Sequence, residues 1–243
     1  MIGLLPCAGK AERIHGLPKY LLPVPGGYLL DWHVQSMKKA KCREVRLESN
    51  KDNLKLLHQF APDAVVWVAE HDDTMAQTVL SAYEDMKVSD CEDETVIFGM
   101  PDTYWTDRNG QSVNIYDLFV RFHSPADVVM MCCQVRHNQW KQGGMVTIDP
   151  HKPNGNVVKI TDKPEQTETP WIWGALMWRP SFLSYLHPED PHIGYGVQRA
   201  VEAGLYVHAI MPGDYDDTEF WDCGTPERYF EMIRVVTGQA ARS

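Results

Sequence analysis

Apolar segments of strand length alternate with amphipathic segments of helix length through the first half of this chain. Residues 64–69 and 95–100 are short apolar runs, which are typical of parallel strands covered on both faces. Residues 29–41 and 75–86 instead carry apolar side chains at helical spacing. This alternation predicts βαβ units, and therefore an α/β fold whose mostly parallel sheet lies between two layers of helices.

The second half of the chain changes character. Residues 143–149 and 157–161 flank a turn-rich segment and predict an antiparallel hairpin. Beyond the hairpin we expect a strand, a short helix that begins at a proline, a longer helix, a strand and a closing helix after Thr225. The first four of these segments are 171–178, 180–186, 196–204 and 205–210. No linker or repeat interrupts the pattern, so we predict a single domain over residues 1–243.

Composition excludes several classes of protein. The 243 residues are 44% hydrophobic and carry a net charge of −10, which argues for a packed core and against a nucleic-acid-binding surface. No stretch of 18 apolar residues predicts a membrane span, and the first residues do not resemble a signal peptide. Six cysteines are scattered without a C-x-x-C pair. We therefore expect a cytoplasmic protein with reduced, mostly buried thiols, in which Cys132 and Cys133 face opposite sides of a strand.

The first strand runs into a turn of small residues followed by cations. Ala8 and Gly9 leave backbone N–H groups open to a phosphate, and Arg13 and Lys19 bring positive charge to the same place. The pattern indicates a nucleoside triphosphate cradle, although it lacks the G-x-x-x-x-G-K-[ST] of a P-loop. An ordinary strand–turn–helix opening with solvated cations is the alternative interpretation.

Two aspartates from distant parts of the chain follow segments of strand character. Asp102 comes directly after the apolar run 95–100, and Asp222 stands before the closing helix. Ligands of parallel sheets lie beyond the carboxyl ends of the strands, so the two carboxylates could hold one Mg²⁺ there. The alternatives are a turn aspartate at Asp102 and a helix cap at Asp222.

Two further segments carry polar side chains at strand ends. Lys163 precedes a proline, which favours an extended backbone and could aim the side chain into a cleft; a solvated edge lysine is the alternative. Residues 70–77 begin a helix, and Glu70 and Thr74 there could read the edge of a base. Asp73 or Thr74 as a plain helix cap is the competing interpretation.

Six short motifs stand in order between residue 2 and about residue 232. They are Ala-Gly-Lys-Ala-Glu-Arg at 8–13, Pro-Lys-Tyr-Leu-Leu-Pro-Val at 18–24, Asp-Asp-Thr-Met-Ala-Gln at 72–77, Asp102 after its strand, Asp-Lys-Pro at 162–164 and Asp-Cys-Gly-Thr-Pro-Glu at 222–227. Together with Gly144 and Gly174 they resemble the motifs of the sugar-1-phosphate nucleotidyltransferases, most closely the short glucose-1-phosphate thymidylyltransferase-like members.

The resemblance implies a three-layer α/β/α, Rossmann-like (glycosyltransferase-A-like) fold. Residues 1–135 would be the nucleotide-binding half, and 136–243 the sugar-phosphate-binding half with the closing helix. An NTP and a sugar 1-phosphate would give an NDP-sugar and pyrophosphate, with Mg²⁺ as cofactor, in a monomer or small homo-oligomer. The implied site residues are, by role, Arg13, Lys19 and Lys163 for catalysis; Ala8, Gly9, Lys10, Ala11, Glu12, Glu70 and Thr74 for the nucleotide; Gly144, Asp162, Lys163, Trp173 and Gly174 for the sugar phosphate; and Asp102 and Asp222 for the metal.

The chain departs from the family pattern at several positions. Ala11 and Glu12 replace a Gly-Thr pair, which places a carboxylate near the triphosphate, and Asp162 replaces a glutamate that meets sugar hydroxyls. The base and the acceptor therefore stay open. A cytidylyltransferase for a non-sugar phosphate (an alcohol, choline or a phosphonate) and a nucleotide-sugar-binding protein of weak activity are the alternatives.

Overall fold

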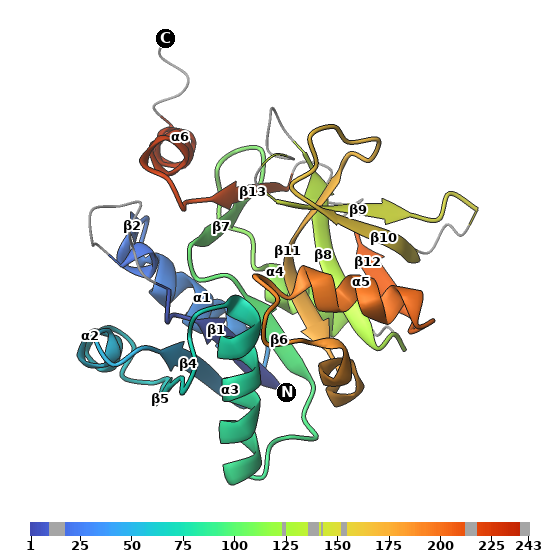
Figure 1. Cartoon of the computed structure of the whole chain (residues 1–243). Helices are drawn as coiled ribbons and strands as arrows, with labels where there is room; N and C mark the ends of the chain where they lie inside the picture. The colour runs from blue at the N-terminus through green and yellow to red at the C-terminus, as the bar shows by residue number, and fades with distance from the viewer. Residues whose placement is uncertain are drawn as a thin grey trace.

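A computed structural model describes residues 1–9, 18–122, 125–135, 141, 143–151, 155–211 and 218–238. Arg13, together with the predicted nucleotide-binding residues Lys10, Ala11 and Glu12, lies outside these described residues. Strands and helices alternate in the first half, as predicted (Figure 1). The strands are β1 Ile2–Pro6, β2 Pro23–Val24, β3 Gly27–Tyr28, β4 Glu44–Ser49, β5 Val65–Val68, β6 Val96–Gly99, β7 Thr103–Thr106, β8 Val128–Gln134, β9 Gly144–Ile148, β10 Val157–Asp162, β11 Trp171–Trp178, β12 Val207–Ile210 and β13 Glu219–Asp222. The helices are α1 Leu29–Lys39, α2 Leu54–Phe60, α3 Met75–Val88, α4 Ile115–Arg121, α5 Gly194–Glu202 and α6 Pro226–Val236, with 3-10 turns η2 Lys19–Leu21 and η4 Pro180–Tyr185.

A nine-stranded sheet runs through the centre, in the order β10-β9-β11-β6-β1-β4-β5, with β8 and β12 joined to it through β11. The strands β6, β1, β4 and β5 are parallel to one another, and so are β8 and β12. The strand β11 is antiparallel to β6, β8 and β9, and β10 is antiparallel to β9. All strands of this sheet except β10 and β11 therefore point the same way, which confirms a mostly parallel sheet with an antiparallel extension.

Side chains that alternate along the strands pack against two separate helical layers. In β8, Val129 and Met131 pack with α1 and α4 on one face, whereas Val128 and Met130 pack with α3 and α5 on the other. Cys132 and Cys133 follow the same alternation and face opposite layers, as predicted. All six cysteines are buried and stand outside disulfides, in agreement with the prediction of buried thiols. The result is the three-layer arrangement that the alternating sequence pattern predicts.

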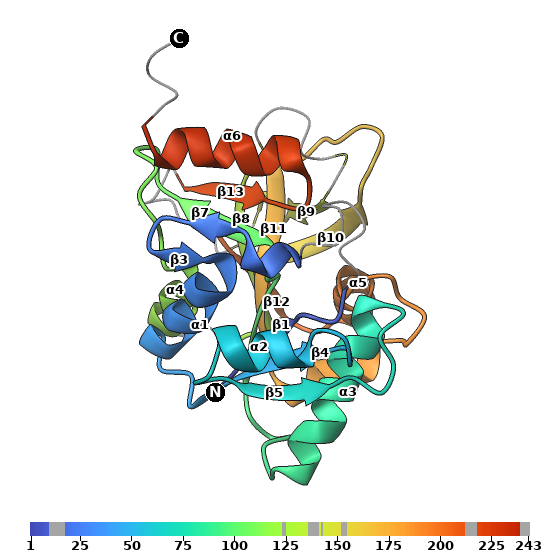
Figure 2. The ribbon, with the colours of Figure 1, turned by 90° about the vertical axis from the view of Figure 1, so that its left-hand side faces the viewer.

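A small second sheet lies outside the central one. Its two strands, β7 and β13, are antiparallel, and Asp222 pairs with Thr103. The helix α6 lies alongside this pair (Figure 2), and its N-cap is Thr225, whose hydroxyl accepts from the Arg228 backbone N–H at 3.5 Å. The cap at Thr225 agrees with the sequence prediction.

Some local predictions differ from the structure. The strand β5 stands at the edge of the sheet, with no strand paired beyond it among the described residues, and its side chains are only half-buried. The prediction of a strand covered on both faces is therefore wrong there. The short helix predicted to begin at a proline is confirmed, since η4 begins at Pro180 as a 3-10 helix. Within the described segments, no helix is both long and apolar enough to cross a membrane.

Candidate active site

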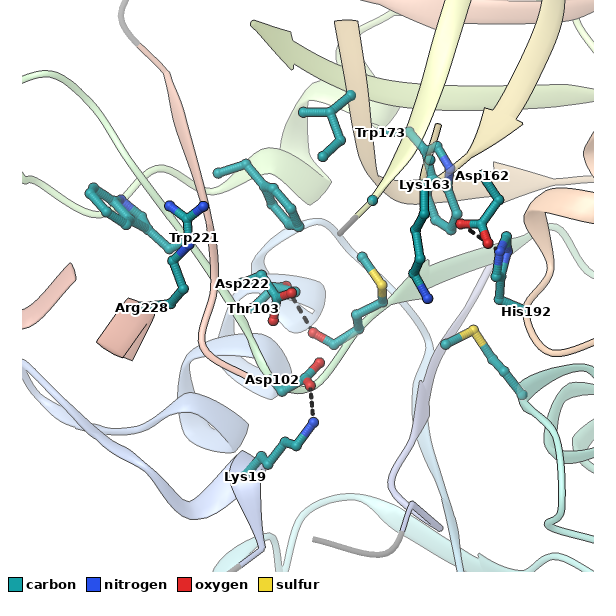
Figure 3. Close-up of a pocket in the computed structure, with 16 residues that line it drawn as sticks. Lys19, Asp102, Thr103, Asp162, Lys163, Trp173, His192, Trp221, Asp222 and Arg228 are labelled. Carbon is teal, nitrogen blue, oxygen red and sulfur yellow. Dashed lines mark hydrogen bonds and ion pairs between the residues drawn. The ribbon is translucent and has the colours of Figure 1, made fainter. Parts of the chain in front are cut away.

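Two cavities meet at an ion pair between Lys19 and Asp102. The Lys19 Nζ atom lies 3.1 Å from Oδ2 of Asp102 (Figure 3), and both side chains are about one quarter exposed. The smaller cavity, of about 170 Å³, extends from this pair to Cys7 and Gly9 after the first strand. The larger cavity, of about 240 Å³, extends from the same pair to the β9–β10 extension. The pair therefore stands at the junction of the two cavities, which we name after the sequence predictions: the smaller is the nucleotide-side cavity and the larger is the acceptor-side cavity.

The second carboxylate, Asp222, reaches this junction through the small sheet. Asp222 pairs with Thr103 across β13 and β7, and the Cys223 N–H donates to the Asp102 carbonyl oxygen at 2.8 Å. Both aspartates consequently line the larger cavity with Lys19. The two sequence-predicted metal residues are brought together, although they are far apart in the chain.

Gly224 leaves room for these three charged groups. A Cβ atom on Gly224 would lie 2.7 Å from Oδ1 of Asp222, 3.3 Å from Nζ of Lys19 and 3.5 Å from Oδ2 of Asp102. Any side chain would therefore fill the space between them. The Gly224 N–H also donates to Oδ1 of Asp222 at 2.8 Å, which fixes that carboxylate.

The side chains at this junction decide which cation could bind between Asp102 and Asp222. Among the described residues no group of three or more His, Cys, Asp or Glu side chains converges on a point, so a structural zinc site is not formed there. Two carboxylates fit Mg²⁺, which usually completes its coordination with phosphate oxygens and water. Asp102 and Asp222 could therefore hold Mg²⁺ against a bound phosphate.

Two asparagines fix the start of the first loop. The Asn50 Nδ2 atom donates to the Ala8 carbonyl oxygen at 2.7 Å, and Asn53 Nδ2 donates to the Cys7 carbonyl oxygen at 3.3 Å. Ala8 is buried, whereas Gly9 is exposed and has open space around its α-carbon. The backbone at Gly9 is thus held in place and accessible to a ligand, as the cradle prediction requires.

The acceptor-side cavity is built on β9, β10 and β11. Ile172 pairs with Met145, so Trp173 and Gly144 come next in the same register. A Cβ on Gly144 would lie 2.1 Å from Nε1 of Trp173, so the indole needs a glycine there. Gly174 is packed behind the cavity, because its Cβ would lie 2.5 Å from Trp105 and 2.6 Å from Phe220. Gly144 and Trp173 thus line the cavity, whereas Gly174 makes room for its aromatic wall.

Asp162 and Lys163 also line this cavity, but the backbone of Lys163 differs from the prediction. Its φ is +39°, in the left-handed region, so the prediction of an extended lysine before Pro164 is wrong. The strand β10 ends at Asp162, and the Lys163 N–H then bonds to the Gly143 carbonyl oxygen at 3.1 Å. This bond belongs to the tight bend that points the side chain into the cavity (Figure 3).

Glu70 and Thr74 are not among the residues that line either cavity. Glu70 is exposed, and its backbone N–H bonds to the Ser81 hydroxyl. Thr74 is the N-cap of α3: its hydroxyl accepts from the Gln77 N–H at 3.0 Å and donates to the Pro188 carbonyl oxygen at 2.7 Å. The cap interpretation therefore accounts for Thr74, and contact of either residue with a base stays a prediction.

The structure places at this site three further residues that the sequence analysis did not identify. His192 and Arg228 both line the larger cavity, and Asn50 holds the first loop. Arg228 follows directly after the Asp-Cys-Gly-Thr-Pro-Glu motif, so its proximity to Asp222 was a usable signal. Nothing local marks His192, because its neighbours in the cavity come from other elements.

Burial keeps the thiols near the site protonated. Burial, with Asp102 and Asp222 nearby, raises the pKa of Cys223 well above its usual value. Burial, together with Glu48 and Asp102, likewise raises the pKa of Cys7. A protonated thiol is a poor nucleophile, so neither cysteine suits covalent catalysis. The site instead offers fixed charges, which suits phosphoryl transfer.

Comparisons with known proteins agree with this fold. The fold is similar to a UDP-glucose pyrophosphorylase solved with UDP-glucose, with a TM-score of 0.76 at 12% identity over 98% of each chain. It is also similar to a putative glucose-1-phosphate thymidylyltransferase from Bacillus anthracis, solved in complex with sucrose, with a TM-score of 0.75 at 14% identity over 97% of this chain and 95% of that one. No curated protein matches the sequence significantly. Residues 3–141 match the model of the MobA-like NTP transferase domain, so the chain belongs to this family of nucleotidyltransferases.

Proposed function

We propose that this protein is a sugar-1-phosphate nucleotidyltransferase, which condenses an NTP with a sugar 1-phosphate to give an NDP-sugar and pyrophosphate. The observation that carries the proposal is the position of the Lys19–Asp102 pair between the two cavities. An NTP bound over Gly9 would present its α-phosphate at this junction. A sugar phosphate in the cavity of Asp162 and Lys163 would meet it from the other side.

The proposed reaction needs positioning and charge neutralisation more than covalent chemistry. A phosphate oxygen of the acceptor attacks the α-phosphorus in line, a new P–O bond forms, and the bond to pyrophosphate breaks. Lys19 would stabilise the charge on the α-phosphate, and Lys163 would hold the acceptor phosphate. The Lys163 side chain lines the larger cavity, where its ammonium group could contact an acceptor phosphate.

Asp102 and Asp222 would hold Mg²⁺ beside the α-phosphate. When bound, the ion would neutralise the negative charge that develops on the phosphate oxygens. We assign Arg13 to the leaving pyrophosphate from the sequence motif alone, since it lies outside the described residues.

Pyrophosphate release from variants tests the carboxylate assignment. We expect Asp102→Asn and Asp222→Asn each to lower kcat by at least about 100-fold, as for the loss of an electrostatic catalytic group. Asp63→Asn is the matched control, because Asp63 is exposed and pairs only with Lys38 among the described residues. Near-normal turnover in both cavity variants would remove the metal assignment.

The acceptor assignment is tested through Lys163. We expect Lys163→Ala to raise the Michaelis constant for the sugar phosphate with little change for the NTP. The opposite pattern would contradict the role of this lysine.

A cytidylyltransferase for a quaternary ammonium phosphate is the second candidate. Trp173 and Phe220 form an aromatic wall of the larger cavity, and such walls bind quaternary ammonium groups by cation–π contact. Assays that pair each NTP with hexose 1-phosphates and with phosphocholine separate the two functions. Binding of an NTP without pyrophosphate release from any pair would instead indicate a binding protein.

A further inference from the structure

The loop between η4 and α5, residues 187–193, places a histidine in the acceptor-side cavity. Asp190 is almost fully buried and forms a two-pronged ion pair with Arg199 of α5. Its Oδ2 atom also accepts from the His187 backbone N–H at 3.1 Å, and the Arg199 Nε atom donates to the Tyr185 carbonyl oxygen at 2.9 Å. These bonds tie the start and the middle of the loop to α5, so the segment that carries His192 is firmly anchored.

The same loop also touches the first turn of α3. Thr74 donates to the Pro188 carbonyl oxygen at 2.7 Å, and the Met75 N–H lies 3.4 Å from the Pro191 carbonyl oxygen. The loop is therefore held from two sides. Pre-organised groups recognise a ligand with less loss of conformational entropy than mobile ones do.

Hydrogen bonding fixes which nitrogen of His192 carries the proton. The Gly194 backbone N–H donates to Nδ1 at 3.1 Å, so in the neutral ring the hydrogen is on Nε2. A Cβ on Gly194 would lie 2.9 Å from Nδ1 and 3.5 Å from the indole of Trp173. The glycine thus allows the imidazole to lie close to the backbone and to face the cavity.

The Nε2 atom of His192 lies next to the carboxylate of Asp162 in the wall of the cavity. It lies 2.9 Å from Oδ1 of Asp162 (Figure 3), and the two side chains are 14% and 18% exposed. This close contact does not have the geometry of a hydrogen bond, and Nε2 has no hydrogen-bond partner among the described residues. A donor and an acceptor therefore stand side by side at the edge of the cavity, and a buried donor without a partner is costly.

We propose that His192 and Asp162 form a hydroxyl-recognition pair, in which His192 donates to the oxygen of an acceptor hydroxyl and Asp162 accepts its hydrogen. This inference rests on the proposed function and deepens it: the acceptor is a polyhydroxylated phosphate, and His192 is a specificity-determining residue. A quaternary ammonium group has neither a donor nor an acceptor for this pair. Its binding would leave the Nε2–H unsatisfied in a desolvated site.

Substitution of His192 tests the pair. His192→Phe keeps a flat ring beside Tyr195 and removes the donor, whereas His192→Gln keeps an N–H group on a chain of similar length. The probes are glucose, galactose and mannose 1-phosphates and the monodeoxy forms of the best of them. His187→Phe is the matched control, because His187 belongs to the same loop, is half-exposed, contacts Glu189 through its ring and is not among the residues that line the larger cavity.

We expect His192→Phe to raise the Michaelis constant of the hexose phosphate roughly tenfold and to leave that of the NTP unchanged, as for the loss of one buried hydrogen bond. His192→Gln should recover part of the loss. With the wild-type protein, one deoxy form should have a Michaelis constant about tenfold higher than that of the parent hexose phosphate. With His192→Phe, the Michaelis constants of the parent and of this deoxy form should be similar. The inference would be overturned if every deoxy form raised the Michaelis constant equally in both proteins, or if the wild type preferred phosphocholine.

Calorimetric binding separates this inference from the proposed function. If the wild type binds a hexose 1-phosphate, loses it on His192→Phe and yet releases no pyrophosphate, the hydroxyl pair holds and the catalytic proposal fails. If pyrophosphate is released but His192→Phe behaves like His187→Phe, the catalytic proposal holds and the hydroxyl pair fails. Absence of binding for every hexose 1-phosphate overturns the hydroxyl pair.

Discussion

Replacement of Glu48 by glutamine should remove a specific pH dependence of stability. Glu48 lies near the end of β4, has no exposed surface, and neither carboxylate oxygen has a hydrogen-bond partner among the described residues. Burial, reinforced by Asp85 and only partly opposed by Arg46, raises its pKa from 4.5 to about 8. The folded protein therefore holds this proton more tightly than the unfolded chain does.

The sign and the size of the effect follow from linkage. Because the pKa is higher in the folded state, the contribution of Glu48 to stability is complete below pH 4.5 and is lost as the pH rises to about 8. Between pH 5.5 and pH 8 the loss is on the order of 3 kcal/mol. For a domain of this size it corresponds to a fall in Tm of about 6–12 °C. The glutamine in Glu48→Gln cannot ionise, so the stability of this variant lacks this pH dependence.

Urea unfolding of both proteins across this pH range measures the difference directly. Other titrating groups affect both proteins alike, so the gap between the two curves isolates Glu48. Arg46 keeps a partner in the variant, because it also forms an ion pair with Glu44 and lies 5.7 Å from the ring centre of Trp67. Parallel curves for the wild type and the variant would refute the reasoning, since they would show that Glu48 does not titrate in this window.

Two other substitutions test how the scaffold supports the site. Gly144→Ala should lower stability by about 1–3 kcal/mol, because its Cβ would lie 2.1 Å from Nε1 of Trp173. It should also raise the Michaelis constant for the acceptor more than that for the NTP. Thermal unfolding and steady-state assays measure the two effects, and an unchanged Tm would contradict the packing argument. His33 is buried, its pKa is lowered by burial to about 3, and its Nε2 atom lies 3.0 Å from the Thr103 carbonyl oxygen, next to Asp102. His33→Leu should cost about 1–3 kcal/mol at neutral pH, since it removes the buried hydrogen bonds of His33 with that carbonyl and with the Tyr116 hydroxyl. The stability that neutral His33 provides is present above pH 6.5 and is lost as the pH falls towards 3, so acidification should destabilise the variant less than the wild type. Urea unfolding at pH 7 and pH 5 measures the difference, and an equal loss of stability in both proteins would contradict it.

The layers of the fold were predictable because their signals are local. Side-chain alternation in the strands and helical spacing in the helices each depend on a few neighbouring residues. The strand β11 matches its predicted range 171–178 throughout, and β8 separates Cys132 from Cys133 as expected. The strand β7 was missed, because its polar ends and its place directly after Asp102 resemble a loop.

The candidate site was predictable only in part. Strand ends on one edge of a parallel sheet converge, so Asp102, Lys19 and the first loop could be placed together from the sequence. Lys163 was assigned the wrong backbone, because the bend after β10 is set by the bond to Gly143 from the neighbouring strand. The roles of these residues in catalysis remain predictions for the assays above.

The sequence by itself determined the three-layer fold, the motifs of the nucleotide-side cavity and the carboxylates that follow the strands. Only the tertiary structure decided which distant side chains meet. The pairing of β7 with β13 brings Asp222 to Asp102, and the anchored loop before α5 brings His192 to Asp162. Local propensity depends on adjacent residues, whereas these contacts depend on strand register and on the packing of elements far apart in the chain.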